Sequence, residues 1–141
     1  MKRNVIGALM TLIVAFSIAV PVVQAQQTIM TANVPFAFSV GDKQLPAGAY
    51  AVRQNGPRQT LIQSADSANS VLSIYYYAGP SKADETKLVF HKVGDRYFLA
   101  EIWTSARGQG FAVPESKLEK EMRASNSGPQ SGVETMIVAL R

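Results

Sequence analysis

Two apolar runs joined by Gly94-Asp95 constrain the fold more than any other part of the sequence. Thr86–Val93 and Arg96–Ser105 are rich in β-branched and aromatic residues, which favour β-strands. Glycine at the first of the two central positions suits a type II′ turn, the tight connection of an antiparallel hairpin. The two runs are therefore predicted to pair with each other across this turn.

Both faces of the predicted hairpin are apolar. If Val93 lies opposite Arg96, then Leu88 lies opposite Glu101. One face then holds Val89, Phe98, Ala100 and Ile102, and the other holds Leu88, Phe90, Tyr97, Leu99 and Trp103. A sheet region that is apolar on both sides needs cover on both sides, so we expect Trp103 to be largely buried.

Shorter strand-like runs lie on both sides of the hairpin and are separated by turn residues. They are Val34–Val40, the stretch around Tyr50 and Val52, Gln59–Ala65, Val71–Ala78 and Val133–Leu140. Gln26–Asn33 is interpreted as a polar lead-in. Pro114–Ala124 is the helix candidate and the expected cover for the hairpin. We predict an all-β fold, a small antiparallel sandwich or barrel of about seven or eight strands with one short helix at 114–124.

The N-terminal segment has the pattern of a cleavable export signal, residues 1–25. Lys2-Arg3 is followed by the almost uninterrupted apolar stretch Val5–Val20, and Val23-Gln24-Ala25 supplies the small residues that a signal peptidase reads. The alternative is a retained membrane anchor. However, Pro21 breaks the segment near its end and no charged stop follows it.

Cleavage after Ala25 leaves residues 26–141 as a single β domain with no stable membrane anchor. The whole chain has 14 basic and 10 acidic residues, and loss of Lys2 and Arg3 lowers its net charge from +4 to +2. The remaining charges are scattered, which argues against a nucleic-acid partner. The chain has no cysteine, so disulfides and a lipidated cysteine are both excluded. We expect a periplasmic or secreted protein.

His91 is the only histidine in the chain. A nucleophile–histidine–acid unit would have to use this imidazole, yet its predicted neighbours on the sheet are the apolar residues Val89, Val93 and Phe98. A zinc site needs companion ligands at suitable spacing, and the sequence shows none around His91. We interpret His91 as a structural residue, and we expect no catalytic site, no metal and no cofactor.

Glu101 and three consecutive tyrosines are the candidate ligand-binding residues. Glu101 shares its predicted face with apolar residues, where a carboxylate needs a partner. It is interpreted as a rim residue paired with a lysine or arginine, with a functional acid as the alternative. Tyr75 and Tyr77 are predicted to share one face of their strand, and Tyr76 to lie on the other. Tyrosines on a strand pack against neighbouring strands or bind sugars and apolar ligands, so this run is the predicted binding surface.

A pattern of the form VPFxFxVG…LPAGxYxV opens the predicted domain. It consists of Val34-Pro35-Phe36-Ala37-Phe38-Ser39-Val40-Gly41 and Leu45-Pro46-Ala47-Gly48-Ala49-Tyr50-Ala51-Val52. This opening resembles that of small exported bacterial proteins which are themselves uncharacterised, and the run from Leu88 to Ala124 is also similar to theirs. The resemblance implies a secreted β domain. It brings no known activity and no site residues.

Three classes of function are consistent with these sequence observations. The first is a non-catalytic domain of the periplasm or cell surface that binds or organises an unknown protein partner. The second is a small β-barrel carrier of an apolar ligand, whose cavity the aromatic strands would line. The third, an enzyme, lacks a recognisable base and nucleophile. An apolar cavity of roughly 300 Å³ or more would favour the carrier, and a filled core would favour the first function.

Overall fold

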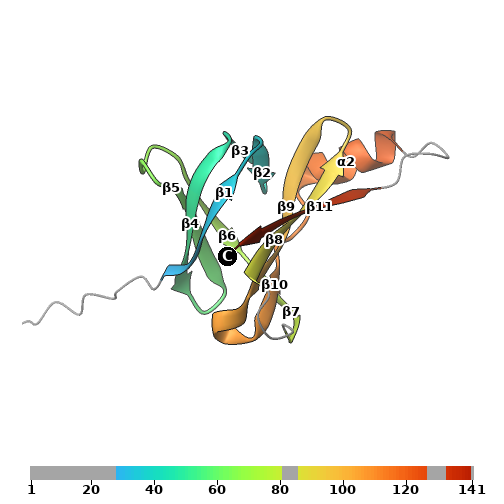
Figure 1. Cartoon of the computed structure of the whole chain (residues 1–141). Helices are drawn as coiled ribbons and strands as arrows, with labels where there is room; N and C mark the ends of the chain where they lie inside the picture. Colours follow the sequence, from blue (N-terminus) through green and yellow to red (C-terminus); the bar gives the residue numbers. More distant parts are fainter. Residues whose placement is uncertain (1–27, 81–85, 127–132, 141) are drawn as a thin grey trace, which may run out of the picture.

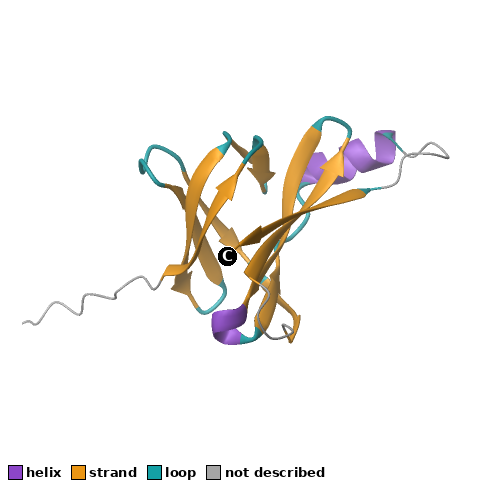
Figure 2. Cartoon of the chain, viewed as in Figure 1, coloured by secondary structure: helices purple, strands orange, loops and turns teal. Residues whose placement is uncertain are grey.

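Strands make up most of the residues that the computed structural model describes, which are residues 28–80, 86–126 and 133–140. Eleven strands form two sheets, and one α-helix and one short 3-10 helix complete the described elements. The prediction of an all-β fold with one short helix is confirmed (Figure 2). The expected signal peptide, residues 1–25, lies outside the described residues. Within the described ranges no helix has the length and hydropathy that a membrane span requires.

The strands are arranged as two facing sheets, a sandwich-like architecture (Figure 1). The first sheet has the order β1 (Thr28–Val34), β4 (Gly48–Gly56), β5 (Gln59–Ser64) and β6 (Ser70–Ile74). The second has the order β11 (Glu134–Leu140), β8 (Thr86–Val93), β9 (Arg96–Thr104), β10 (Gln109–Ala112) and β7 (Tyr76–Pro80). The short strand β2 (Phe38–Val40) runs parallel to β9 and pairs with β3 (Lys43–Leu45).

Strand β1 corrects the interpretation of Gln26–Asn33 as a polar lead-in. Its alternate side chains, Met30, Ala32 and Val34, are buried, and the residues between them are exposed. The pattern has the period of a strand with one buried face, but small and polar residues make its contrast weak. Pairing with β4 supplies the partner that makes this segment a strand.

Several aromatic rings pack against one another in and around the core between the two sheets. Phe38 lies edge-on to Tyr50 and to Phe90, with ring centroids 5.1 and 5.3 Å apart. Phe36 stacks on Tyr97 at a centroid distance of 4.1 Å. Such pairs contribute roughly 0.5–1.5 kcal/mol each beyond the burial of their area. Through these pairs Phe36 and Phe38 connect the opening segment of the domain to strands of both sheets.

The hairpin of β8 and β9 forms across Gly94-Asp95 as the sequence predicts. Val93 pairs with Arg96, and His91 pairs with Phe98. Gly94 has a φ of +59°, the sign that the first central position of a type II′ turn requires.

Beyond the Phe90–Leu99 pair the predicted register of the hairpin is wrong, because β9 has a β-bulge at Ala100. Because β9 has one extra residue there, Leu88 pairs with Ile102 instead of with Glu101. A one-residue shift reverses the faces of all residues that follow. Ile102 therefore points into the core and is 1% exposed, whereas Trp103 lies on the outer face and is only partly buried. Trp103 is thus partly buried on the outer face and is not a residue of the core between the sheets.

Helix α2 (Lys117–Ser125) packs on the outer face of the second sheet, against β8 (Figure 1). The prediction that a helix covers this face is confirmed, but the helix starts later than the expected Pro114. Its N-cap is Ser116, whose Oγ accepts a hydrogen bond from the Glu119 N–H at 3.0 Å. Serine followed three residues later by glutamate is typical of a helix start.

The C-terminal strand β11 pairs antiparallel with β8, with Glu134 opposite Lys92. Met136 and Val138 pack against the core from this strand. The strand predicted at Val133–Leu140 is therefore present, from Glu134 to Leu140. In the described sheet β11 has a partner on one side only, so it forms an edge.

Candidate functional site

The chain passes from the first sheet to the second at Tyr75, between β6 and β7. The Tyr75 N–H donates to the carbonyl oxygen of Arg58 at 3.0 Å, and its hydroxyl donates to that of Pro57 at 3.3 Å. Its ring packs edge-on against Phe111, with centroids 4.6 Å apart, and the residue is 7% exposed. Tyr75 is thus a core residue that fixes the corner between the sheets.

Tyr76 and Tyr77 are the exposed members of the tyrosine run, at 53% and 63%. The expectation that Tyr75 and Tyr77 share one face is wrong, because Tyr75 is buried. The expectation assumed one continuous strand over Val71–Ala78. Alternation of faces holds only within a strand, and the strand is interrupted at Tyr75.

All three tyrosines line an open pocket of about 300 Å³, which we call the tyrosine pocket. Its other lining residues are Gln54, Pro57, Arg58, Arg107, Gln109 and Phe111. They come from the end of β4 and its turn to β5, from the 3-10 helix η1 (Ser105–Arg107) and from β10. These elements meet at the lower end of the molecule in Figure 1. The volume is at the lower end of the range for small-molecule sites.

The lining of the tyrosine pocket is cationic and aromatic. Arg58 and Arg107 bring two guanidinium groups, and no aspartate or glutamate is among the described lining residues. Gln54 and Gln109 add amides, and the Gln54 Nε2 donates to the carbonyl oxygen of Gly56 at 3.0 Å. Guanidinium groups bind carboxylates through paired hydrogen bonds, and tyrosine rings offer flat apolar faces. The pocket therefore suits a small, ring-shaped anion with further polar groups.

Glu101, the fourth residue of the predicted binding surface, is not part of this lining. It accepts a hydrogen bond from the Trp103 Nε1–H at 2.6 Å on the outer face of β9. The register places Ala112 between Glu101 and Tyr76, which separates them by two strand spacings, roughly 10 Å. Because of its hydrogen bond to Trp103, Glu101 orients the tryptophan ring and not a pocket ligand. The ring lies across Gly110 of the next strand.

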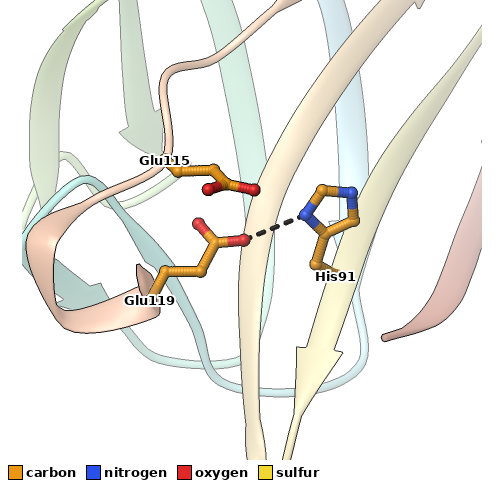
Figure 3. Close-up of side chains that lie close together, drawn as sticks. All are labelled: His91, Glu115 and Glu119. Atoms are coloured by element: carbon orange, nitrogen blue, oxygen red, sulfur yellow. Dashed lines mark hydrogen bonds and ion pairs between the residues drawn. The ribbon is translucent and has the colours of Figure 1, made fainter. Parts of the chain in front are cut away.

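A second group of polar side chains forms where α2 packs on β8 (Figure 3). The Nδ1 of His91 and the Oε1 of Glu119 are 2.9 Å apart. Glu119 is only 3% exposed, and the cap at Ser116 holds its backbone. Sequence reasoning placed only apolar neighbours around His91 and missed this carboxylate, which is 28 residues away along the chain.

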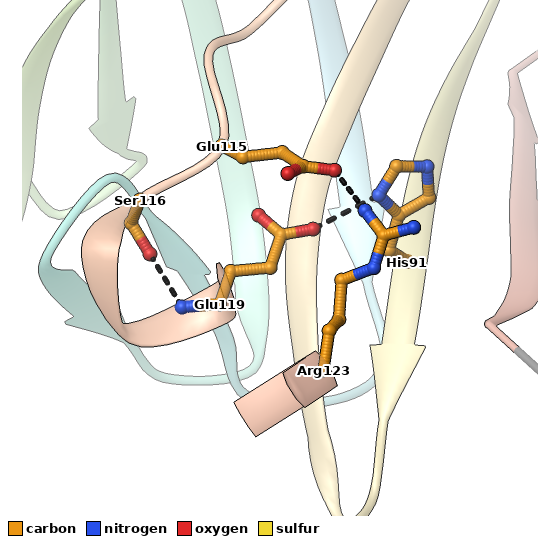
Figure 4. A network of polar contacts seen from close by, with 5 residues as sticks. All are labelled: His91, Glu115, Ser116, Glu119 and Arg123. Carbon is orange, nitrogen blue, oxygen red and sulfur yellow. Dashed lines mark hydrogen bonds and ion pairs between the residues drawn. The ribbon is translucent and has the colours of Figure 1, made fainter. Parts of the chain in front are cut away.

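Glu115 and Arg123 extend this group (Figure 4). Arg123, in the last turn of α2, donates a hydrogen bond to the Glu115 carboxylate. One donor atom from each of His91, Glu115 and Glu119 lies within 4.8 Å of the other two. Imidazole nitrogens and carboxylate oxygens are ligands of divalent transition metals. The expectation that His91 has no companion ligands is therefore corrected. The pattern Ser116-x-x-Glu119 marks a helix start in the sequence, but it does not show what that helix packs against.

Comparisons of the chain with protein families, curated proteins and solved structures found no match.

Proposed function

We propose that this protein is an exported, non-catalytic β domain that binds a small carboxylated sugar in the tyrosine pocket. The lining carries this proposal, because it combines two guanidinium groups with exposed tyrosine rings and contains no described carboxylate. The export pattern of residues 1–25 supports a place in the periplasm or outside the cell, where acidic sugars of the cell envelope are accessible.

Each chemical group of such a ligand has a counterpart in the pocket. Arg58 and Arg107 bind the carboxylate, because a guanidinium presents several N–H donors in one plane. The exposed rings of Tyr76 and Tyr77 pack against the sugar ring, and their hydroxyls exchange hydrogen bonds with its hydroxyls. Tyr75 is held by the backbone of the β4–β5 turn and keeps this corner rigid. A preformed site loses less ordering entropy on binding.

A binding role is supported over a catalytic one by the residue types at the pocket. The described lining contains no histidine, aspartate or glutamate, the groups that most often transfer protons near neutral pH. The carrier of an apolar ligand is the alternative, and the volume of about 300 Å³ is its support. Against it, the pocket is open and four of its lining side chains are arginines or glutamines.

The test is isothermal titration of the protein, recovered after export, with D-glucuronate and with D-glucose as the neutral counterpart. We expect glucuronate to bind more tightly, and added salt to weaken its binding, because the guanidinium–carboxylate contact is electrostatic. Arg58→Gln removes one charge and is expected to weaken glucuronate binding by roughly tenfold or more, the loss of one charge-assisted hydrogen bond.

Arg96→Gln is the matched control, since Arg96 is exposed at the β8–β9 turn and lies outside the pocket. It removes the same charge and is expected to leave binding unchanged. Equal affinity for the two sugars, or equal effects of the two variants, would disprove the proposal. Binding of an aliphatic probe that Tyr77→Ala abolishes would instead support the carrier.

A further inference from the structure

We propose that His91, Glu115 and Glu119 form a binding site for a divalent transition metal of the zinc class, which links α2 to β8. The site is separate from the tyrosine pocket and does not depend on the function proposed there. It draws on two elements, since His91 comes from β8 and the two glutamates come from the N-terminal end of α2 and the residue before its cap.

The donor geometry is close to that of a bound metal. Zinc binds imidazole nitrogen and carboxylate oxygen at about 2.0–2.2 Å, so donors around a tetrahedral ion are about 3.4 Å apart. The three donor atoms already lie within 4.8 Å of one another, and His91 Nδ1 is 2.9 Å from Glu119 Oε1. Small rotations of the partly exposed His91 and Glu115 side chains would bring all three to bonding distance.

Glu119 is the fixed member of the site. It is 3% exposed, and its backbone N–H is bonded to Ser116 Oγ at the start of α2. His91 and Glu115 have side-chain exposures of 28% and 34%, so an ion can approach from solvent. One buried ligand with two accessible ones gives a preorganised site that still has an entry path. A water molecule would complete the fourth position.

Charge balance also favours a divalent cation. Two adjacent carboxylates, one of them buried, repel each other unless positive charge lies between them. Arg123 now supplies one positive charge through its contact with Glu115 (Figure 4). A divalent ion bound by both carboxylates and a neutral imidazole would be balanced without Arg123, whose 39%-exposed side chain can turn to solvent. Arg123 is therefore the internal competitor of the metal.

Zn²⁺ itself is the probe, added to the metal-stripped protein, with Mg²⁺ as the contrasting ion that prefers oxygen ligands. We expect Zn²⁺ at 100-fold above its Kd to raise Tm by roughly 10 °C, because it binds the folded state. His91→Gln is expected to abolish this rise. Glu121→Gln removes a charge from the exposed face of the same helix and is expected to preserve it.

Arg123→Gln gives a readout that a purely structural role of the cluster would not produce. Removing the competing cation is expected to tighten Zn²⁺ binding by about tenfold, measured by titration calorimetry. If His91→Gln fails to fold, Zn²⁺ titration of Arg123→Gln still tests whether the metal binds at this cluster. A rise in Tm that is the same in His91→Gln as in the wild type, no rise in the wild type, or weaker binding to Arg123→Gln would each overturn the proposal. His91 and Glu119 would then act only as a tether between helix and sheet.

Discussion

The hydroxyl of Tyr50 donates a hydrogen bond to the carbonyl oxygen of Pro46 at 2.6 Å. Tyr50 is 3% exposed in β4, while Pro46 is exposed in the turn before that strand. The bond anchors the Pro46-Ala47-Gly48 corner to a ring that packs against Phe38 in the core. It gives a physical reason for tyrosine at this position, because phenylalanine would fill the same space without the hydroxyl.

Tyr50→Phe is expected to lower the free energy of unfolding by about 1 kcal/mol, the usual contribution of one neutral hydrogen bond. Urea titration followed by circular dichroism measures this change. Tyr76→Phe is the matched control, since it removes the same atom from a residue that is 53% exposed, and it is expected to have almost no effect. Equal effects of the two substitutions would mean that the Pro46 contact adds nothing to stability.

The pH dependence of stability provides a second test of Tyr50. Burial raises the pKa of the Tyr50 hydroxyl, and the negative charge of Asp66 raises this pKa further. The folded protein therefore holds this proton more tightly than the unfolded chain, whose tyrosines titrate near 10. The stability contribution is intact below about pH 10 and is lost as the pH rises through the raised pKa.

We therefore expect the free energy of unfolding to fall more steeply above about pH 10 in the wild type than in Tyr50→Phe. Urea titrations from about pH 8.5 to pH 11 make the comparison, with the other tyrosines common to both proteins. Parallel curves for the two proteins would contradict the assignment of this pH dependence to Tyr50.

Gly110 is required by the tryptophan ring on the neighbouring strand. A Cβ atom at Gly110 would lie 2.5 Å from ring atoms of Trp103, closer than any normal contact. Gly110→Ala is expected to cost about 1–3 kcal/mol through this overlap. In the background of Trp103→Ala the same change is expected to be nearly neutral, a coupling that a double-mutant cycle in urea measures. Additive effects would show that the ring avoids the new methyl group at no cost.

Removal of β11 by truncation after Gly132 is expected to destabilise the domain. The change deletes the contacts of Met136 and Val138 with the core and leaves the edge of β8 unpaired. We expect a loss of at least about 2 kcal/mol and a tendency to associate through the free edge. Urea titration and size-exclusion chromatography measure the two effects. A truncated protein that stays monomeric and equally stable would show that β11 is dispensable.

Export with cleavage after Ala25 is expected from the pattern of residues 1–25. Mass spectrometry of the protein recovered from an expressing bacterium should find a chain that begins at Gln26. Replacement of Ala25 by a large charged residue, Ala25→Arg, is expected to block cleavage and retain the precursor. Recovery of the intact N-terminus of the unmodified protein in the membrane fraction would instead support the retained anchor.

Local patterns determined the parts of this fold that depend on near neighbours. Runs of apolar, β-branched and aromatic residues predicted the strands β8, β9 and β11, and Gly94-Asp95 predicted the turn between the first two. Strand propensity and glycine at a positive φ are properties of a few consecutive residues, so the sequence alone reveals them. The sequence also shows three consecutive tyrosines in one run, but the exposure of Tyr76 and Tyr77 and the burial of Tyr75 follow from the structure.

Tertiary structure alone decided the features that depend on distant residues. The bulge at Ala100 exchanged the faces of Ile102 and Trp103, because pairing with β8 and the packing of the core set where an extra residue is absorbed. Glu119 is separated from His91 by 28 residues, and only the packing of α2 on β8 brings their side chains within 2.9 Å. Hydrophobic burial acts without regard to distance along the chain, so such contacts follow from the folded arrangement and from no local pattern.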